Sequence, residues 1–196
     1  MIASPQGTGL EVWIGLGSNL GDRFANLQAA AAWFVEADLE LSPIFETAPW
    51  GLIDQPWFLN AVARLVWSQS PQQLLDACLA CEAHLGRVRG VRNGPRIIDI
   101  DVLMFGDRIV RDSGLRIPHP GIAQRRSVLE PWAQMAPALL IPELDRTVAD
   151  LRDAAVVRFT DQQVHPFGTS GSVKQPLDLE ALGSHGVGQT ELSAGS

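Results

Sequence analysis

The stretch 94-GPRIIDIDVLMFGD-107 combines a core strand with two acids. From Ile97 to Phe105 it is an apolar run typical of a buried strand, interrupted only by Asp99 and Asp101. An ionised carboxylate in an apolar core costs several kcal/mol unless a cation meets it. Because strand side chains alternate between faces, both aspartates point to one face, about 6.6 Å apart along the strand. We therefore expect one face of this strand to pack in the core and the other to open onto a polar site.

Two carboxylates on one strand face have two interpretations. They can share one or two hard divalent ions such as Mg²⁺, which keep open positions for water and phosphate oxygens. They can equally pair with arginines or lie on a solvated face, because Asp-x-Asp is a common pattern. The glycine-punctuated loop before the strand, 86-GRVRGVRNGPR-96, favours the first interpretation, since arginines outnumber acids in this part of the chain. Carboxylates with nearby arginines are typical of phosphoryl transfer.

Basic residues gather around this strand although the chain as a whole is acidic. The formal net charge is -7, from 15 Lys and Arg residues against 22 Asp and Glu residues. Residues 87–126 hold nine of those 15 basic residues and only four aspartates. The overall charge argues against general nucleic-acid binding. All nine are arginines, whose forked guanidinium groups suit bidentate contacts with phosphate.

The lysine content excludes two large families of phosphoryl-transfer enzymes. Lys174 is the only lysine, and no Gly-x-x-x-x-Gly-Lys-Ser/Thr loop is present. P-loop enzymes and protein kinases both depend on such a lysine. The segment 15-GLGSNLGD-22 is rich in glycine but lacks the spacing of a dinucleotide-binding loop. We interpret it as a tight turn from a strand into a helix.

Length and composition indicate one globular domain. The 196 residues are 46% hydrophobic, with no apolar run of about 18 residues that could span a bilayer. The N-terminus, 1-MIASPQGTGLEVW-13, lacks the basic start and apolar segment of an export signal, so we expect a cytoplasmic protein that does not bind membranes. Cys78 and Cys81 fall in a predicted helix without a second pair of metal ligands, and we expect them to pack in the core.

Periodicity and turn residues predict an α+β fold, a sandwich in which helices cover a mostly antiparallel sheet. The strands are expected at 11–19, 39–47, 58–67 and 97–105, with a hairpin partner at 108–110, and the helices at 21–37, 71–85, 127–137 and 147–155. The loop 48–57 is rich in Pro, Gly and Trp and too apolar to be a mere connection. We expect a folded domain over residues 1–158 and a disordered, Gly/Ser-rich tail over 159–196.

Four segments of the chain form a distinctive set: 14-IGLGSNLGDR-23, 45-FETAPWGLIDQPWFLNAV-62, 86-GRVRGVRNGPRIIDIDVLMFGD-107 and 117-IPHPGIAQRRSVLEPWAQMAP-137. Together they resemble the 6-hydroxymethyl-7,8-dihydropterin pyrophosphokinase family of folate biosynthesis. The resemblance runs in order from about residue 11 to about 155. It implies a ferredoxin-like fold and the Mg²⁺-dependent transfer of the β,γ-diphosphate of ATP to the hydroxymethyl group of a reduced pterin, with release of AMP. It also implies small-molecule substrates only, and we expect a monomer.

The resemblance assigns roles to individual residues. By position, Asp99 and Asp101 would bind two Mg²⁺ ions that bridge the ATP phosphates, with Asp99 also near the pterin. Arg87 and Arg96 would neutralise the triphosphate and complete the catalytic set. The other implied ATP-site residues are Glu82, Arg89, Arg92, His119 and Arg125. The implied pterin pocket consists of Thr47, Trp50, Phe58 and Asn60, in which Asn60 reads the amide edge of the ring and Phe58 stacks on its face.

The chain departs from the family pattern at three places. Ser127 stands where many members carry an aromatic residue, so we hypothesise that Trp50 or Trp57 supplies the second ring of the pterin pocket. Asn93 stands where some relatives carry Trp or Tyr. The tail beyond about residue 160 has no counterpart that we can align.

Two other functions remain open on the residues alone. A ferredoxin-like module could bind a nucleotide without chemistry, and a nuclease could use the same aspartates with a metal ion. The nuclease is disfavoured by the negative charge and by the lack of further acids near the pair. For the enzyme, we expect in-line attack by the substrate hydroxyl on the β-phosphorus, with loops 48–57 and 86–95 closing to exclude water.

Overall fold

The computed structural model describes residues 9–51, 54–88, 90–91 and 93–168 of the chain. Its main elements are the strands β1 (Leu10–Ser18), β2 (Glu40–Leu41), β3 (Phe45–Thr47), β4 (Phe58–Trp67), β5 (Asp99–Phe105) and β10 (Val164–Pro166), and the helices α1 (Arg23–Trp33), α2 (Pro71–His84), α3 (Arg126–Met135) and α4 (Val148–Arg158). Short elements complete the fold: β6 (Val110–Arg111), β7 (Arg116–Ile117), β8 (Leu140–Ile141), β9 (Arg146–Thr147) and the 3-10 turns Val35–Ala37 and Ile122–Gln124.

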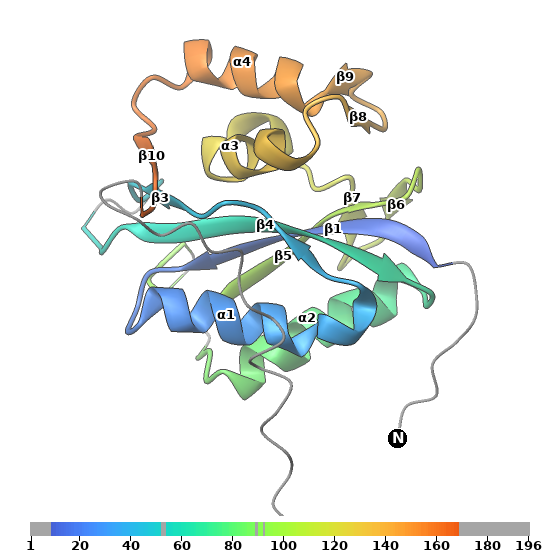
Figure 1. Ribbon diagram of the computed structural model, residues 1–196, viewed down its shortest axis with the longest axis horizontal. Coiled ribbons are helices and arrows are strands. Elements are labelled where there is room, and N and C mark those ends of the chain that lie inside the picture. Colours follow the sequence, from blue (N-terminus) through green and yellow to red (C-terminus); the bar gives the residue numbers. More distant parts are fainter. Residues whose placement is uncertain (1–8, 52–53, 89, 92, 169–196) are drawn as a thin grey trace, which may run out of the picture.

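One antiparallel sheet forms the centre of the molecule (Figure 1). Its strands follow the order β10-β3-β4-β1-β5, and β2 also pairs with β4. Helices α1 and α2 cover one face of this sheet, and α3 and α4 cover the other. The predicted α+β sandwich with a mostly antiparallel sheet is therefore confirmed.

Local sequence signals explain where the helices begin. Ser70 and Gln73 form a capping box at the start of α2, and Thr147 and Asp150 form another at the start of α4. Asp22 caps α1, since its side chain accepts a hydrogen bond from the backbone N–H of Ala25. The exception is α3, whose N-cap residue makes no side-chain capping bond.

The β5 strand divides its side chains as its sequence predicts. Ile98, Ile100 and Val102 lie in the core beneath α1 and α2. Asp99 and Asp101 lie on the opposite face, where Leu103 packs with the α3 and α4 residues. The two acids thus lie on the face of the sheet that α3 covers. They are outside the part of that face where apolar residues of α3 and α4 pack.

The pairing of β1 with β5 provides space in front of the acids. Gly17 is the register partner of Asp99, and Gly15 is the partner of Asp101. Since neither glycine carries a side chain, the sheet surface beside the two carboxylates is open. Both glycines lie in the segment that we interpret as a tight turn, but they fall within strand β1.

The predicted hairpin partner of β5 at 108–110 is wrong. Val110–Arg111 instead pairs with Arg116–Ile117 in a separate two-stranded sheet. Gly106, with φ of +50°, turns the chain away from β5. The outer edge of β5 is bonded by other groups: the Glu82 carboxylate accepts from Ile100 N, and Leu103 O accepts from His119 N.

Two further differences concern segment boundaries. The single strand expected at 39–47 is split into β2 and β3, with Pro43 between them, because proline cannot donate to a strand ladder. The chain after residue 158 continues into the sheet, since Val164–Pro166 pairs with β3, although the sequence places this segment in a tail. Residues 169–196, the remainder of that tail, lie outside the described residues. No helix in the described part of the chain is long and apolar enough to cross a membrane.

Both cysteines are core residues, as predicted. Cys78 and Cys81 are fully buried against the α1 and α2 side of the sheet, and both are free thiols. Burial raises the pKa of the Cys78 thiol well above its ordinary value and that of Cys81 to about 12. Neutral, buried thiols of this kind behave as small apolar side chains.

Candidate active site

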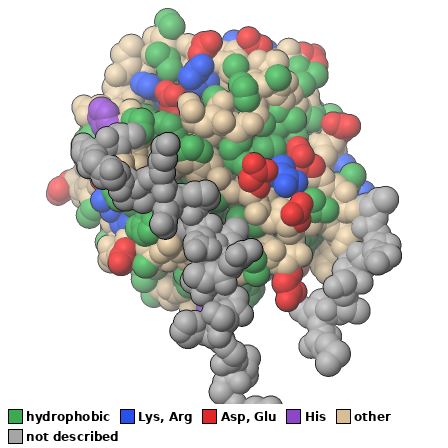
Figure 2. All heavy atoms as spheres, in the orientation of Figure 1, with side chains coloured by type: hydrophobic (Ala, Val, Ile, Leu, Met, Phe, Trp, Pro, Cys, Tyr) green, Lys and Arg blue, Asp and Glu red, His purple; other side chains and the backbone are tan. Residues whose placement is uncertain are grey.

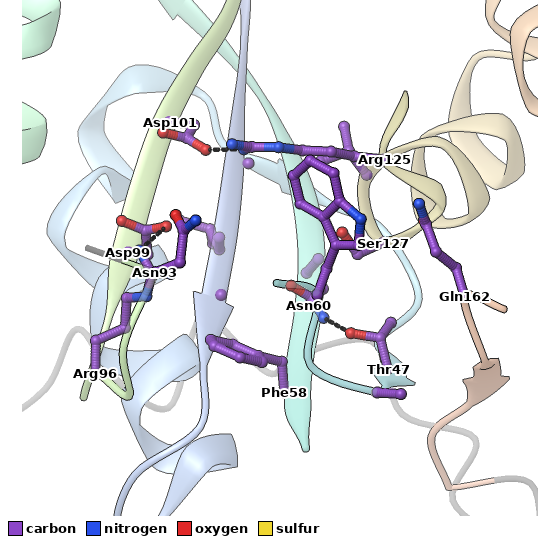
Figure 3. A pocket seen from close by; sticks show the side chains of 17 residues that line it. Thr47, Phe58, Asn60, Asn93, Arg96, Asp99, Asp101, Arg125, Ser127 and Gln162 are labelled. Atoms are coloured by element: carbon purple, nitrogen blue, oxygen red, sulfur yellow. Dashed lines mark hydrogen bonds and ion pairs between the residues drawn. The ribbon is translucent and has the colours of Figure 1, made fainter. Parts of the chain in front are cut away.

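Two cavities meet at the acidic end of β5. The first, of about 200 Å³, lies between the sheet and the start of α3, and Thr47, Trp50, Phe58 and Asn60 help to line it (Figure 3). The second, of about 410 Å³, lies between α2 and the loop after it. Among the residues that the structure describes, four line both cavities: Asn93, Arg96, Asp99 and Asp101. Two molecules, one bound in each cavity, would therefore meet beside the two carboxylates.

Arginines hold both aspartates. Asp99 pairs with Arg87 through an N–O distance of 2.6 Å and with Arg96 through one of 2.9 Å. Asp101 pairs with Arg125 at 2.6 Å, across the first cavity (Figure 3). All of these side chains are partly exposed to the cavities. The structure thus shows the acids paired with arginines, as in the second interpretation of the acid pair. It brings six of the candidate residues, counting His119 beside Asp101, into one cluster.

Glu82 is the buried anchor of this cluster. Only 6% of the residue is exposed, and its carboxylate accepts from Ile100 N at 2.7 Å while it pairs with Arg87. Burial raises the pKa of Glu82, an effect that its bond to Ile100 and the charge of Arg87 partly offset. Burial also acts to lower the pKa of Arg87, but the charges of Asp99 and Glu82 outweigh it and the pKa is raised. Arg87 is therefore fixed as a cation facing the second cavity.

The lining of the first cavity is partly aromatic and includes side-chain amides. The Arg96 guanidinium lies over the Phe58 ring, with its Cζ atom 5.6 Å from the ring centroid. Asn60 donates through Nδ2 to Thr47 Oγ1 at 2.8 Å, which orients its amide. Trp50 lines the same cavity and is 52% exposed.

The two tryptophans proposed as a second ring have different surroundings. Trp57 stacks on His165 of β10, with ring centroids 5.9 Å apart and planes 10° apart, and is not among the cavity-lining residues. Trp50 and Ser127 both line the first cavity. Of the two candidates, only Trp50 is placed to contact a molecule there.

His119 lies behind Asp101 and outside the lining of both cavities. Its Nδ1 accepts from Gly121 N at 3.0 Å, so the proton of the neutral ring is on Nε2, which lies 3.9 Å from Asp101 Oδ1. Burial lowers the pKa of His119, and the nearby Asp101 offsets this only in part. Burial thus favours the neutral form of the His119 imidazole beside Asp101.

Asn19 joins the loops around the two cavities, a role that sequence reasoning missed. Its side chain accepts from Arg96 N at 2.7 Å and donates to Gln55 Oε1 and Pro56 O at 3.1 and 3.0 Å. Gln55 in turn donates to the carbonyl of Asn93 at 3.0 Å. The sequence alone did not assign Asn19 to the site. Its partners lie 36 to 77 residues away, beyond the reach of any local pattern.

Gln162 is a second residue that the sequence did not indicate. It lines the first cavity and lies on the same side of it as Ser127 (Figure 3). It belongs to the segment that composition assigns to the tail, so no local signal pointed to it. Arg89 and Arg92, by contrast, are predicted ATP contacts that lie outside the described residues.

The two carboxylates could bind a hard divalent cation that takes its other ligands from water and a phosphate compound. Among the residues that the structure describes, no group of three or more His, Cys, Asp or Glu side chains could hold a metal ion. Mg²⁺, however, is commonly bound by one or two carboxylates, with water and substrate phosphates as its other ligands. Asp99 and Asp101 supply such carboxylates beside a cavity. The donor set therefore fits an ion that arrives with a phosphate compound and fits poorly with an all-protein cage.

Charged side chains of both signs are mixed on one face of the molecule (Figure 2). Figure 2 shows basic side chains interspersed with acidic and apolar ones on the face that it presents. On that face, the coloured Lys and Arg side chains form no continuous basic stripe.

Comparisons with known proteins agree on one family. Residues 13–137 match the model of the family described as 7,8-dihydro-6-hydroxymethylpterin-pyrophosphokinase (HPPK). The chain is 44% identical over 133 residues to a 2-amino-4-hydroxy-6-hydroxymethyldihydropteridine pyrophosphokinase of Methylorubrum extorquens, an alignment that covers 66% of this chain and 84% of that protein. It is 40% identical over 136 residues to the protein of the same name from Pseudomonas aeruginosa, covering 67% and 84%.

Solved structures share the fold. A chain described as HPPK-DHPS in complex with substrates superposes with a TM-score of 0.62 at 13% identity, over 79% of this chain. The chain spans 45% of the length of that solved protein. At this identity the likeness concerns the fold alone.

Proposed function

Because the chain belongs to the 7,8-dihydro-6-hydroxymethylpterin-pyrophosphokinase family, we propose that its two adjoining cavities divide the two substrates of that reaction. The enzyme is a pyrophosphokinase of folate biosynthesis, and ATP is its co-substrate. In our assignment, the triphosphate lies in the second cavity, along Arg87 and Arg96. The reduced pterin lies in the first, against Phe58 and Asn60.

The observation that carries this assignment is the shared wall of the cavities. Arg96, Asp99 and Asp101 line both, so the β-phosphorus of ATP and the hydroxymethyl group of the pterin can meet there. Placing two reactants in contact converts a bimolecular step into a unimolecular one, which can contribute about 7 kcal/mol or more. Catalysis of phosphoryl transfer rests mostly on such positioning and on neutralisation of charge.

The chemical step is an in-line displacement. The pterin hydroxyl oxygen forms a bond to the β-phosphorus, the bond from that phosphorus to the oxygen of the AMP phosphate breaks, and the hydroxyl proton passes to water. Arg87 and Arg96 would balance the charge that spreads over the phosphate oxygens. Arg125, which pairs with Asp101 in the structure, would contact the phosphates from the α3 side.

Asp99 and Asp101 would hold Mg²⁺ together with the phosphates, and we propose two ions. A bound divalent ion neutralises phosphate charge and orients the phosphate for attack. For the carboxylates to reach it, Arg87, Arg96 and Arg125 would exchange their aspartate contacts for phosphate contacts. This exchange of partners makes the ion pairs of the structure compatible with both interpretations of the acid pair.

In the pterin pocket, recognition would come from one amide and two rings. The amide of Asn60, oriented by Thr47, would read the amide edge of the pterin. Phe58 would stack on one face, and Trp50 would approach from the side where Ser127 leaves space. Glu82 would act through Arg87 and the β5 backbone, because its carboxylate is committed to them.

Formation of AMP tests the function directly. The full chain, incubated with ATP, Mg²⁺ and 6-hydroxymethyl-7,8-dihydropterin, should release AMP and form the pterin diphosphate in equal amounts. Omission of the pterin or chelation of Mg²⁺ should stop both. ATP binding without AMP release would support a non-catalytic module instead, and nicking of supercoiled DNA with Mg²⁺ would support a nuclease.

The cellular setting and assembly state complete the proposal. We propose a cytoplasmic enzyme, since free buried cysteines are typical of a reducing compartment. We also propose a monomer, which size-exclusion chromatography with light scattering would test. A mass near 21.2 kDa is expected for a single chain.

A further inference from the structure

We propose that Gln162 is a positioning residue that clamps the backbone on both sides of Arg125 and thereby fixes the Arg125 guanidinium against Asp101. The inference rests on the proposed function, in which Arg125 contacts the ATP phosphates. Gln162 lies outside residues 13–137, the part of the chain matched to the family.

Helix α3 begins without a cap from its own N-terminal residue. Arg125 is the N-cap residue of this helix but makes no side-chain capping bond. The first N–H groups of a helix have no partner within the helix and need one from elsewhere. Gln162 supplies it from a distant segment, since its Oε1 accepts from Arg126 N at 2.9 Å. Gln162 thus acts as an N-cap of α3 although it lies in another segment of the chain.

The other end of the Gln162 amide holds the residue before Arg125. Its Nε2 donates to the carbonyl of Gln124 at 2.8 Å. One planar amide therefore bonds the peptide groups on both sides of Arg125, which leaves that residue little freedom to rotate or shift. The Arg125 side chain then reaches Asp101, with an Nη1–Oδ2 distance of 2.6 Å.

Gln162 itself is anchored from three sides. Its carbonyl accepts from the Arg126 side chain at 2.9 Å, and its own N–H donates to Phe159 O at 3.2 Å. The next residue, Gln163, accepts through its carbonyl from Ala48 N at 3.0 Å, immediately before β10 pairs with β3. The clamp is therefore tied to the sheet edge that also carries Thr47.

The Arg125 side chain lies in close contact with its surroundings, so its position depends on the backbone that carries it. A Cβ atom placed on Gly121 would lie only 3.1 Å from Arg125 Nε and 3.1 Å from His119, so the guanidinium already fills the space beside it. Misplacement of a positioning group by about 1 Å can cost on the order of 100-fold in rate. We expect loss of the Gln162 amide to move Arg125 off Asp101 and the phosphates.

A double-mutant cycle on AMP formation tests this inference. Gln162→Ala should lower kcat/KM by about 10-fold in the otherwise native chain, yet by less than about 2-fold in an Arg125→Ala background, because its effect passes through Arg125. A general structural role would give the same loss in both backgrounds, and that result would overturn the proposal. The control is Gln163→Ala, since the Gln163 side chain is exposed and only its backbone is used.

Two additions keep the test decisive. Gln162→Met fills the same space without donor or acceptor, and it should reproduce the loss if Gln162→Ala is poorly folded. The same cycle, read on the dissociation constant of a non-hydrolysable ATP analogue, applies if Arg125→Ala turnover is too slow to measure. If the native chain itself forms no AMP, the proposed function fails; if it does and the cycle is additive, only the clamp fails.

Discussion

Arg96 stacks over the ring of Phe58 and at the same time donates to Asp99 at 2.9 Å. One guanidinium thus joins an aromatic wall of the first cavity to the carboxylate that both cavities share. Its planar shape permits this, because a guanidinium can stack through its face while its edge makes hydrogen bonds. The relationship couples the proposed pterin pocket to the proposed triphosphate site through a single side chain.

Arg96→Lys tests whether the planar shape of the guanidinium matters in addition to its positive charge. The lysine keeps a positive charge but cannot stack flat and donate along an edge, so we expect kcat/KM to fall by roughly 10- to 100-fold, in line with the loss of about 1.5–3 kcal/mol for a charged hydrogen bond. Steady-state AMP formation measures this. The matched control is Arg108→Lys, since Arg108 also lies over a phenylalanine, Phe105, but away from both cavities. Equal losses in the two variants would contradict the assignment.

Asp99→Asn and Asp101→Asn should nearly abolish turnover. An amide has the shape of a carboxylate but loses the charge that a divalent ion requires, and we expect kcat to fall by about 100-fold or more. Thermal unfolding should change little, because both side chains are partly exposed and face cavities. Asp107→Asn, an exposed acid just after β5, serves as the control. AMP production near the native rate in both site variants would refute the metal assignment.

Gly17→Ala should weaken pterin binding selectively. A Cβ atom at this position would lie 3.1 Å from Asn60 Oδ1, so the amide that we assign to ring recognition must shift. We expect the KM for the pterin to rise by about 10-fold, equivalent to about 1.4 kcal/mol, with a smaller change in the KM for ATP. Gly114→Ala is the control, since a Cβ there meets nothing within 4 Å. A rise confined to the KM for ATP would place the pterin elsewhere.

The sequence predicted the parts of the fold that depend on local pattern. The alternation of Ile98, Asp99, Ile100 and Asp101 predicts two faces, because the period of a strand is set by its own backbone. Helix α2 is likewise predicted, because Pro71 favours the start of a helix and Gly86 its end. The position of β5 at the edge of the sheet, by contrast, depends on which strands meet in space.

The missed site residues share a physical reason. Asn19 and Gln162 act through side-chain bonds to backbone groups far away in the chain, and such bonds leave no periodic signal. The composition of residues 159–196 also concealed Val164–Pro166, because a three-residue strand on a sheet edge is stabilised by its partner more than by its own sequence. The sequence predicted that arginines gather around the acid strand. Which arginine pairs with which acid depends on the tertiary structure.

The two buried cysteines should make the fold sensitive to alkali. Their pKa values are raised in the folded state above the value of about 8.5 for an exposed thiol. The unfolded chain therefore loses these protons first as pH rises. The stabilisation is complete below about pH 8.5 and is lost progressively above it, by up to about 1.4 kcal/mol per pH unit for each thiol, toward the raised pKa of about 12 at Cys81.

The composition of the chain makes this dependence measurable. There is no tyrosine and only one lysine, so few other side chains titrate in the same window. We expect the free energy of urea-induced unfolding to be lower at pH 10.5 than at pH 8.5 in the native chain, and the decrease to be much smaller in a Cys78→Ala, Cys81→Ala variant. The variant will be less stable at both pH values because small cavities replace the thiols, so the difference between pH values is the relevant quantity. An identical decrease in both proteins would show that other groups control alkaline stability.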